Sequence, residues 1–99
     1  MLSIKIHKTY RNVVAICDSN LIGKKFEQDN LQLDMKETFY KGEEKTKQET
    51  IPLMQDMLKE DSTFNIVGEE SINCALEAGI ISKDGIKQID NIPFALILL

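Results

Sequence analysis

Residues 65–79, NIVGEESINCALEAG, decide most of the fold, because they join a predicted strand directly to a predicted helix. The apolar run ends at Gly68, and from Ile72 onward apolar residues recur at the spacing of a helix with one buried face. Gly79 suits the left-handed position that follows many helices. The stretch therefore predicts a strand, a turn and a helix packed on a sheet.

The same stretch also fits two functional patterns. A helix that begins after Gly68 presents free N–H groups to an anion, but Glu69 and Glu70 already complement the helix dipole and would repel phosphate. Ala75, a small residue four positions before Gly79, fits a helix-turn-helix. The second helix would have to be SKDGIKQID (82–90), which has too few apolar residues for a recognition helix. We favour strand-to-helix packing, and the alternative is a small anion- or metabolite-binding protein or enzyme that uses the Gly68 helix terminus.

Two strands are predicted near the N-terminus. LSIKIHK (2–8) alternates apolar and polar residues, and NVVAIC (12–17) is almost wholly apolar, so the two form an antiparallel hairpin. An even-length loop puts Ile4 opposite Cys17 and turns His7 to the other face, whereas a three-residue loop reverses this. The register therefore decides whether the histidine can meet the cysteine, and we expect His7 and Cys17 to point to opposite faces.

The middle of the chain predicts less regular structure. Residues 18–30, DSNLIGKKFEQDN, favour a turn with one helical turn that Gly23 ends. LQLDM and KETFY (31–40) alternate weakly and predict a further strand, and KGEEK (41–45) predicts a charged surface loop.

An amphipathic helix is predicted within residues 46–61, TKQETIPLMQDMLKED, from its apolar stripe. Its start is open: Thr46 with Glu49 fits a capping box but places Pro52 inside the helix, whereas Thr50 leaves the proline in the first turn. We prefer the later start, or a kinked first turn.

Two further strands, IKQI (86–89) and FALILL (94–99), complete the chain on either side of a tight turn. The order predicts an α+β fold, a mixed and mostly antiparallel sheet with two helices on one face and one parallel crossover near residues 63–89. We expect residues 1–99 to form a single domain. The apolar last strand favours a place inside the sheet or pairing in a homodimer.

Composition limits the function. The chain has 99 residues, 42% hydrophobic and 28% charged, with a net charge of −4, so nucleic-acid binding would need a local basic patch. Without a signal-like or membrane-spanning apolar run we expect a cytoplasmic protein that binds no membrane. Cys17 and Cys74 lie 57 positions apart without a CxxC pair, which fits reduced, buried thiols.

The inventory of reactive side chains is poor. One histidine and two distant cysteines offer neither a favoured Cys-His pair nor the short-spaced ligand pair of a zinc site. We therefore expect no catalytic residue, no metal and no cofactor, and we favour a protein that is not an enzyme.

A binding surface is the remaining prediction. Phe39 and Tyr40 stand beside lysines and a glycine, a neighbourhood that can stack on a base, although a core role for Phe39 is the simpler interpretation. The candidate binding residues are Gly23, Lys24, Lys25, Phe39, Tyr40, Gly42, Asn65, Gly68 and Glu69.

Several segments together resemble a family of short archaeal proteins, domain of unknown function 424. They are LIGKKF (21–26), FYKG (39–42), NIVGE (65–69), ALEAG (75–79) and Ile92-Pro93 before an apolar strand. The resemblance implies a cytoplasmic, single-domain protein with no assigned catalytic residue and an association with translation and RNA processing. Basic residues that the family has near its last strand are replaced here by Phe94-Ala95-Leu96, which weakens an RNA-binding role. We expect an adaptor with a protein or RNA partner.

Overall fold

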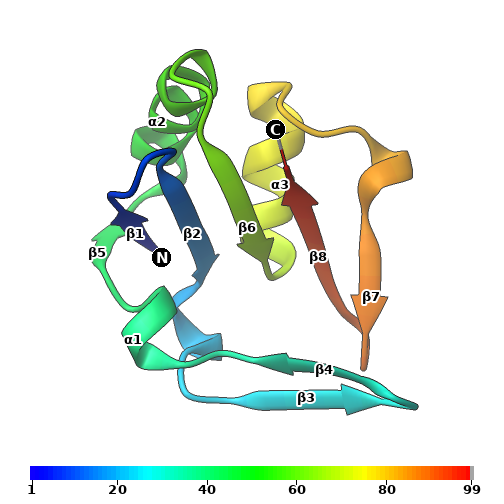
Figure 1. Ribbon diagram of the computed structural model, residues 1–99. Helices are drawn as coiled ribbons and strands as arrows, with labels where there is room; N and C mark the ends of the chain where they lie inside the picture. The colour runs from blue at the N-terminus through cyan, green and yellow to red at the C-terminus, as the bar shows by residue number, and fades with distance from the viewer. Residues whose placement is uncertain (99) are drawn as a thin grey trace.

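A six-stranded sheet in the order β5-β1-β2-β6-β8-β7 forms the centre of the molecule (Figure 1). The strands are β1 (Leu2–His7), β2 (Val13–Asp18), β5 (Glu43–Lys45), β6 (Thr63–Val67), β7 (Lys87–Ile89) and β8 (Ile92–Ile97). β2 and β6 pair in parallel, and the other neighbours are antiparallel, which confirms the predicted mixed, mostly antiparallel sheet of an α+β fold. The computed structural model describes residues 1–98, so Leu99 at the end of the predicted last strand lies outside the described residues.

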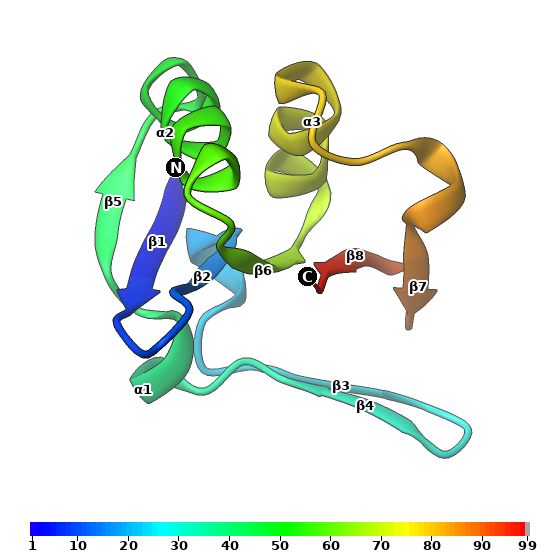
Figure 2. The same ribbon diagram turned by 45° about the horizontal axis from the view of Figure 1, so that its top comes forward.

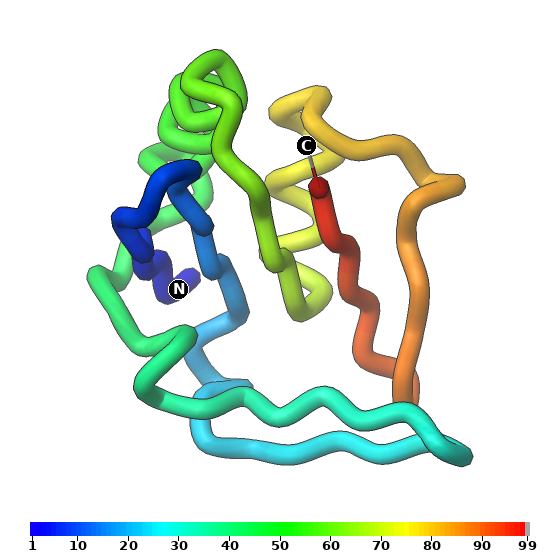
Figure 3. The backbone as a smooth tube through the Cα atoms, in the orientation of Figure 1, coloured from blue at the N-terminus to red at the C-terminus, as the bar shows by residue number. Residues whose placement is uncertain are grey.

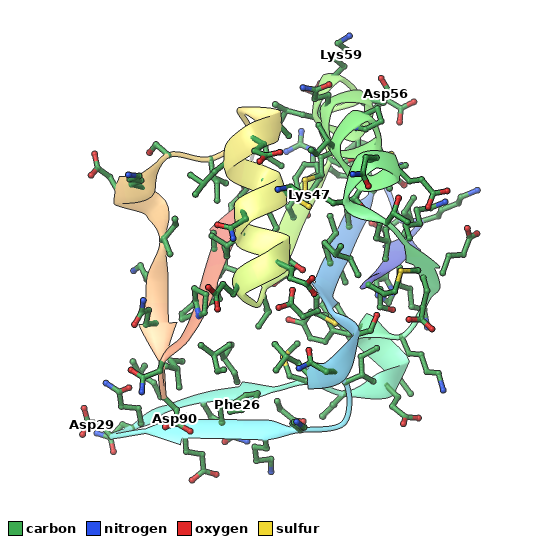
Figure 4. The ribbon with its side chains drawn as sticks, turned by 180° about the vertical axis from the view of Figure 1, so that it is seen from behind. Phe26, Asp29, Lys47, Asp56, Lys59 and Asp90 are labelled. Carbon is green, nitrogen blue, oxygen red and sulfur yellow. The ribbon has the colours of Figure 1, made fainter. Side chains whose placement is uncertain are left out.

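Two helices, α2 (Lys47–Lys59) and α3 (Glu69–Ala78), cover one face of the sheet, as predicted (Figure 2). Lys47 Nζ and Glu77 Oε1 form an ion pair at 2.8 Å that links the helices (Figure 4). The main core fills the space between helices and sheet: Leu2, Ile4, Val14, Ile16, Met54, Met57, Phe64, Ile66, Ile72, Cys74, Ala75 and Ala95. We call this the helix face.

The other face is covered only in part, by a hairpin and a short helix. The hairpin consists of β3 (Lys25–Gln28) and β4 (Leu31–Asp34) and runs across to the turn between β7 and β8 (Figure 3). There the backbone N–H of Asp90 donates to Gln28 Oε1 at 2.7 Å. Phe26 extends from the hairpin toward the sheet, and Asp29 marks its tip (Figure 4). We call this hairpin the arm.

Short helical segments connect the remaining elements. They are α1 (Glu37–Tyr40) and the 3₁₀ turns Ser19–Leu21 and Lys83–Gly85. A second, smaller core lies under the arm and α1: Ala15, Cys17, Leu21, Met35, Tyr40 and Val67. No helix among residues 1–98 is both long and apolar enough to cross a membrane.

The loop between β1 and β2 has an odd number of residues, so the hairpin has the opposite register to that of an even-length loop. Ser3 pairs with Cys17 and His7 with Val13, with residues 8–12 as the loop. An odd-length loop keeps His7 and Cys17 on the same face, so the expectation that they point to opposite faces is wrong. They nevertheless lie four positions apart along the strands, about 13 Å at roughly 3.3 Å per residue, and cannot form a pair.

Helix α2 begins earlier than we preferred. Thr46 Oγ1 accepts from the Glu49 N–H at 3.2 Å, and Glu49 Oε1 accepts from the Thr46 N–H at 3.0 Å, which makes a complete capping box. Pro52 lies inside the helix, where its missing N–H leaves one bond to the Gln48 carbonyl unmade. Two satisfied donors at the cap favour the early start.

Three other predictions in the middle of the chain are wrong. Lys25–Gln28 within the predicted turn is a strand, Glu37–Tyr40 is a helical turn rather than a strand, and Glu43–Lys45 in the predicted loop is an edge strand. Of the strand predicted at 31–40, the first part is confirmed as Leu31–Asp34. These segments have few apolar residues, so local pattern is weak and pairing with the rest of the molecule decides their conformation.

The two C-terminal strands lie as predicted, with β8 inside the sheet between β6 and β7. Asp90 and Asn91 both have positive φ, 52° and 64°, as a tight two-residue hairpin turn requires. Both β6 and β7 are antiparallel to β8, so they are parallel to each other, and α3 makes the predicted crossover. The adjacent parallel pair, β2 with β6, was not predicted.

Candidate functional site

The N-terminus of α3 is occupied by a side chain from the neighbouring strand. Parallel pairing of β2 and β6 brings Asp18, at the end of β2, beside Gly68. The Asp18 carboxylate accepts from the N–H of Glu70 at 3.1 Å and from the N–H and Oγ of Ser71, both at 2.8 Å. It therefore caps a helix that begins about fifty residues later in the sequence.

Gly68 has a packing role in this cap. Its φ is 109°, and a Cβ at this position would lie 2.4 Å from the carboxyl carbon of Asp18. The hollow next to it, about 460 Å³, has three carboxylates and one amino group in its lining, which consists of Met1, Asp18, Ser19, Asn20, Glu69, Glu70 and Asn73. The Met1 amino group lies 3.7 Å from Glu70 Oε2, so the lining has a net negative charge. Since the donors are used and the surroundings are negative, the geometry counts against an anion at this helix terminus.

Phe39 and His7 form a stacked pair at the border of the second face. Their ring centroids lie 4.7 Å apart with an interplanar angle of 17°. His7 Nε2 donates to the Phe39 carbonyl oxygen at 2.9 Å, and Lys5 Nζ donates to the Thr38 carbonyl oxygen at 2.8 Å. These contacts fix α1 against β1 and leave both rings partly exposed.

Tyr40 and Cys17 are buried and stay protonated at neutral pH. Burial raises the pKa of Cys17 to about 12, with the nearby Asp18 charge adding to the rise, and burial raises that of Tyr40 to about 12. A thiol with so high a pKa is a poor nucleophile at neutral pH. Ser3 Oγ donates to the Tyr40 carbonyl at 3.0 Å and accepts from the Gly42 N–H at 2.9 Å, so this segment is part of the scaffold.

Three strands, β2, β6 and β8, present half-buried or exposed side chains on the part of the second face that neither the arm nor α1 covers. Val13, Thr63 and Asn65 are half-buried, and Leu96 is 53% exposed. They project to the same side because Val13 pairs with Thr63, and Asn65 with Leu96. The viewer of Figure 1 looks onto this surface, with the helices behind it. We call these four residues the open face.

The predicted binding residues do not form one surface. Phe39 and Asn65 lie on the second face, but Tyr40 is 8% exposed and cannot stack on a ligand. Lys24 and Lys25 are exposed at the start of the arm. The other four have these places: Gly23 begins the arm, Gly42 contacts the Ile4 carbonyl, and Gly68 and Glu69 begin α3.

Sequence reasoning missed several residues of the second face. Lys5, His7, Thr63 and Leu96 were not among the candidates. The alternation in β1 would have placed Lys5 and His7 on one face, but nothing local shows that this face lacks a cover. Within residues 1–98, no three His, Cys, Asp or Glu side chains are grouped to hold a metal ion.

Comparison with known proteins agrees with the resemblance found in the sequence. The family model described as protein of unknown function (DUF424) matches residues 6–99. The chain is similar to the crystal structure of an uncharacterized conserved protein from Methanopyrus kandleri, an archaeon, with a TM-score of 0.88 and 22% identity over 97% of this chain and 89% of that one. At this identity the likeness shows the fold alone. No curated protein matches the chain.

Proposed function

We propose that the chain, which belongs to the DUF424 family of proteins of unknown function, is a cytoplasmic, non-enzymatic adaptor that binds a partner protein on its open face. The observation that supports this most is the exposure of Leu96, at 53%, on the part of the second face that neither the arm nor α1 covers. An apolar side chain held on a rigid strand offers a partner contact area at little entropic cost.

The breadth of the surface favours a macromolecule. The open face and the His7–Phe39 pair extend from β1 to β8, three strand spacings, or about 14 Å at roughly 4.8 Å each. Small molecules usually bind in concave pockets that enclose most of their surface. Interfaces between proteins combine apolar and polar groups. The open face has both, with Thr63 and Asn65 of β6 between Val13 of β2 and Leu96 of β8.

Charge favours protein over RNA. The net charge is −4, so nucleic acid is repelled at long range. None of the four residues of the open face is basic. The exposed Lys24 and Lys25 lie at the start of the arm, away from the strands that form the open face.

The alternative, an anion- or metabolite-binding protein or enzyme that uses the start of α3, has less support. Asp18 already accepts the N–H groups that an anion would need. A ligand there would have to displace a buried carboxylate that makes three hydrogen bonds. A thermal-shift screen with phosphate and nucleotides would reveal such a ligand as an increase in melting temperature.

The test is an affinity pull-down of the tagged protein from lysate of its own organism, with and without ribonuclease. The proposal predicts a partner protein that survives ribonuclease and is lost with Leu96→Glu. The matched control is Leu31→Glu on the arm, since the exposed fraction of Leu31, 58%, is similar to that of Leu96, 53%. Partners that vanish after ribonuclease would instead indicate RNA, and equal loss in both variants would argue against the open face.

Light scattering of the purified protein separates a partner from a second copy of the chain. A monomer that still captures its partner agrees with the adaptor. A dimer that Leu96→Glu dissociates would identify the open face as a homodimer interface instead.

A further inference from the structure

Only the first half of the outer edge of β1 is paired with another strand. β5 pairs with Leu2, Ser3 and Ile4 and begins at Glu43, so Gly42 and the residues before it do not continue the pairing along β1. A Cβ on Gly42 would lie 2.0 Å from the Ile4 carbonyl oxygen, so this carbonyl points toward the β5 side. In an antiparallel strand alternate residues direct both backbone groups the same way, so the N–H and C=O of Ile6 also point outward. Among residues 1–98 no strand pairs with them.

A groove of about 500 Å³ lies along this edge. Its apolar floor is formed by Ile4 and Ile6 of β1 and by Leu53 of α2. Ile6 and Leu53 are half-buried, so each still has apolar surface in contact with solvent. The groove therefore combines an unpaired strand edge with an apolar strip, the two features used when a domain binds an extended peptide as an added strand.

The rim of the groove is basic although the protein is acidic. Lys5, Lys8 and Lys45 line it, together with Glu43. Lys45 Nζ lies 3.4 Å from a Glu43 carboxylate oxygen, so this pair is neutral and the excess positive charge comes from Lys5 and Lys8. The Thr38 carbonyl holds the Lys5 amine in place, and Lys8 is exposed.

We propose that this edge binds an extended acidic segment of a partner protein as an additional strand in line with β5. The Ile6 backbone groups pair with the segment. One set of its alternating side chains lies over Ile6 and Leu53, and the other, acidic set faces Lys5, since successive residues of a strand point to opposite faces. The site contains none of the four residues of the open face, although Lys5 lies between the two. It goes beyond the proposed function, and because Leu96→Glu affects the open face and Lys8→Glu this edge, either one can fail without the other. Two separate surfaces are what an adaptor needs to join two partners.

The first test uses synthetic peptides as probes. A fluorescein-labelled eight-residue Glu-Val repeat should bind the full chain in fluorescence anisotropy, and a Lys-Val repeat should not. A Glu-Val repeat with alternate amides N-methylated keeps its charge but cannot donate to the strand edge, and should bind at least about tenfold more weakly. The proposal would be overturned if the methylated peptide bound as tightly as the unmethylated one, or if neither acidic peptide bound. Lys5 and Lys8 would then serve only to prevent edge-to-edge association between copies of the sheet.

The second test locates the peptide. Amide hydrogen exchange of the ¹⁵N-labelled protein should slow by at least about tenfold at Ile6 when the Glu-Val peptide is added, because an exposed N–H becomes paired. Unchanged exchange at Ile6 would contradict strand addition even if the peptide binds.

Charge reversal provides the matched pair of variants. Lys5→Glu with Lys8→Glu should weaken peptide binding by at least about tenfold, whereas Lys24→Glu with Lys25→Glu makes the same change of charge on the arm and should have little effect. Lys8→Glu alone, at an exposed position, should weaken binding without any risk to folding. Equal loss from the two double variants would show a general charge effect and reject the site.

Discussion

The two faces of the sheet use alternate residues of the same strands for different purposes. On the helix face, Val14 and Phe64 are 0% exposed beneath α2 and α3. Their chain neighbours Val13, Thr63 and Asn65 point to the other side and keep part of their surface in solvent. A single strand can therefore supply stability through one set of side chains and binding through the other, because the period of two separates them completely.

The largest expected effect tests this division directly. Phe64→Ala should lower the free energy of unfolding by about 3–5 kcal/mol, because it leaves a large cavity in the closed core. Phe39→Ala removes the same ring from the border of the second face, where solvent can fill the space, and should cost no more than about half as much. Urea unfolding of the two variants measures both values. Equal losses would mean that the second face contributes to stability as much as the first.

Removal of the cap that joins β2 to α3 should have the next largest effect. Asp18→Ala should cost about 2–3 kcal/mol, since it leaves the Glu70 and Ser71 N–H groups without their acceptor. Ser71→Ala removes one of the three bonds and serves as the milder control. A loss below about 0.5 kcal/mol in Asp18→Ala would show that water replaces the carboxylate at little cost.

Alkaline pH provides a smaller test of the core under the arm. The pKa of Cys17 rises from 9.0 to about 12 on folding, so the unfolded chain loses this proton first as pH rises. Stability from this thiol is complete below pH 9.0 and is lost progressively toward pH 12. Between pH 8 and pH 10.5 we expect a fall of about 2 kcal/mol from this group. Cys17→Ala should make the pH dependence less steep, and an unchanged slope would contradict this assignment.

The smallest expected effect on stability is that of Leu96→Glu. An exposed strand residue can usually be replaced within about 0.5 kcal/mol. The same variant should abolish binding of the partner, which separates function from stability at one residue. If unfolding measurements show a loss above about 2 kcal/mol, Leu96 contributes to the fold and cannot report on binding alone.

Much of the helix face could be predicted from the sequence. The apolar stripes of α2 and α3, the alternation in β1 and the left-handed Gly79 are local signals, and each is confirmed. The start of α2 is harder to predict, because Pro52 and the capping box at Thr46 indicate different starts. A complete box at Thr46 and Glu49 is the stronger local signal here.

The second face was harder to predict because its elements depend on contacts distant in sequence. β5 contains no apolar residue and forms because Gly42 lets the chain approach β1. The arm has one apolar residue in β3, although Asp29-Asn30 between β3 and β4 is a turn signal that could have revealed it. Nothing near Asp18 in the sequence indicates that it caps α3, since only the parallel pairing of β2 with β6 brings it there.

Site-specific photo-crosslinking tests the central claim most directly. Benzoylphenylalanine would replace Leu96 on the open face or, in a second variant, Gln48, an exposed residue of α2 on the opposite side of the sheet. After irradiation in lysate of the organism, the account predicts a crosslinked partner protein from position 96 and none from position 48. The same partner crosslinked from position 48 alone would contradict the account and assign binding to the helix face.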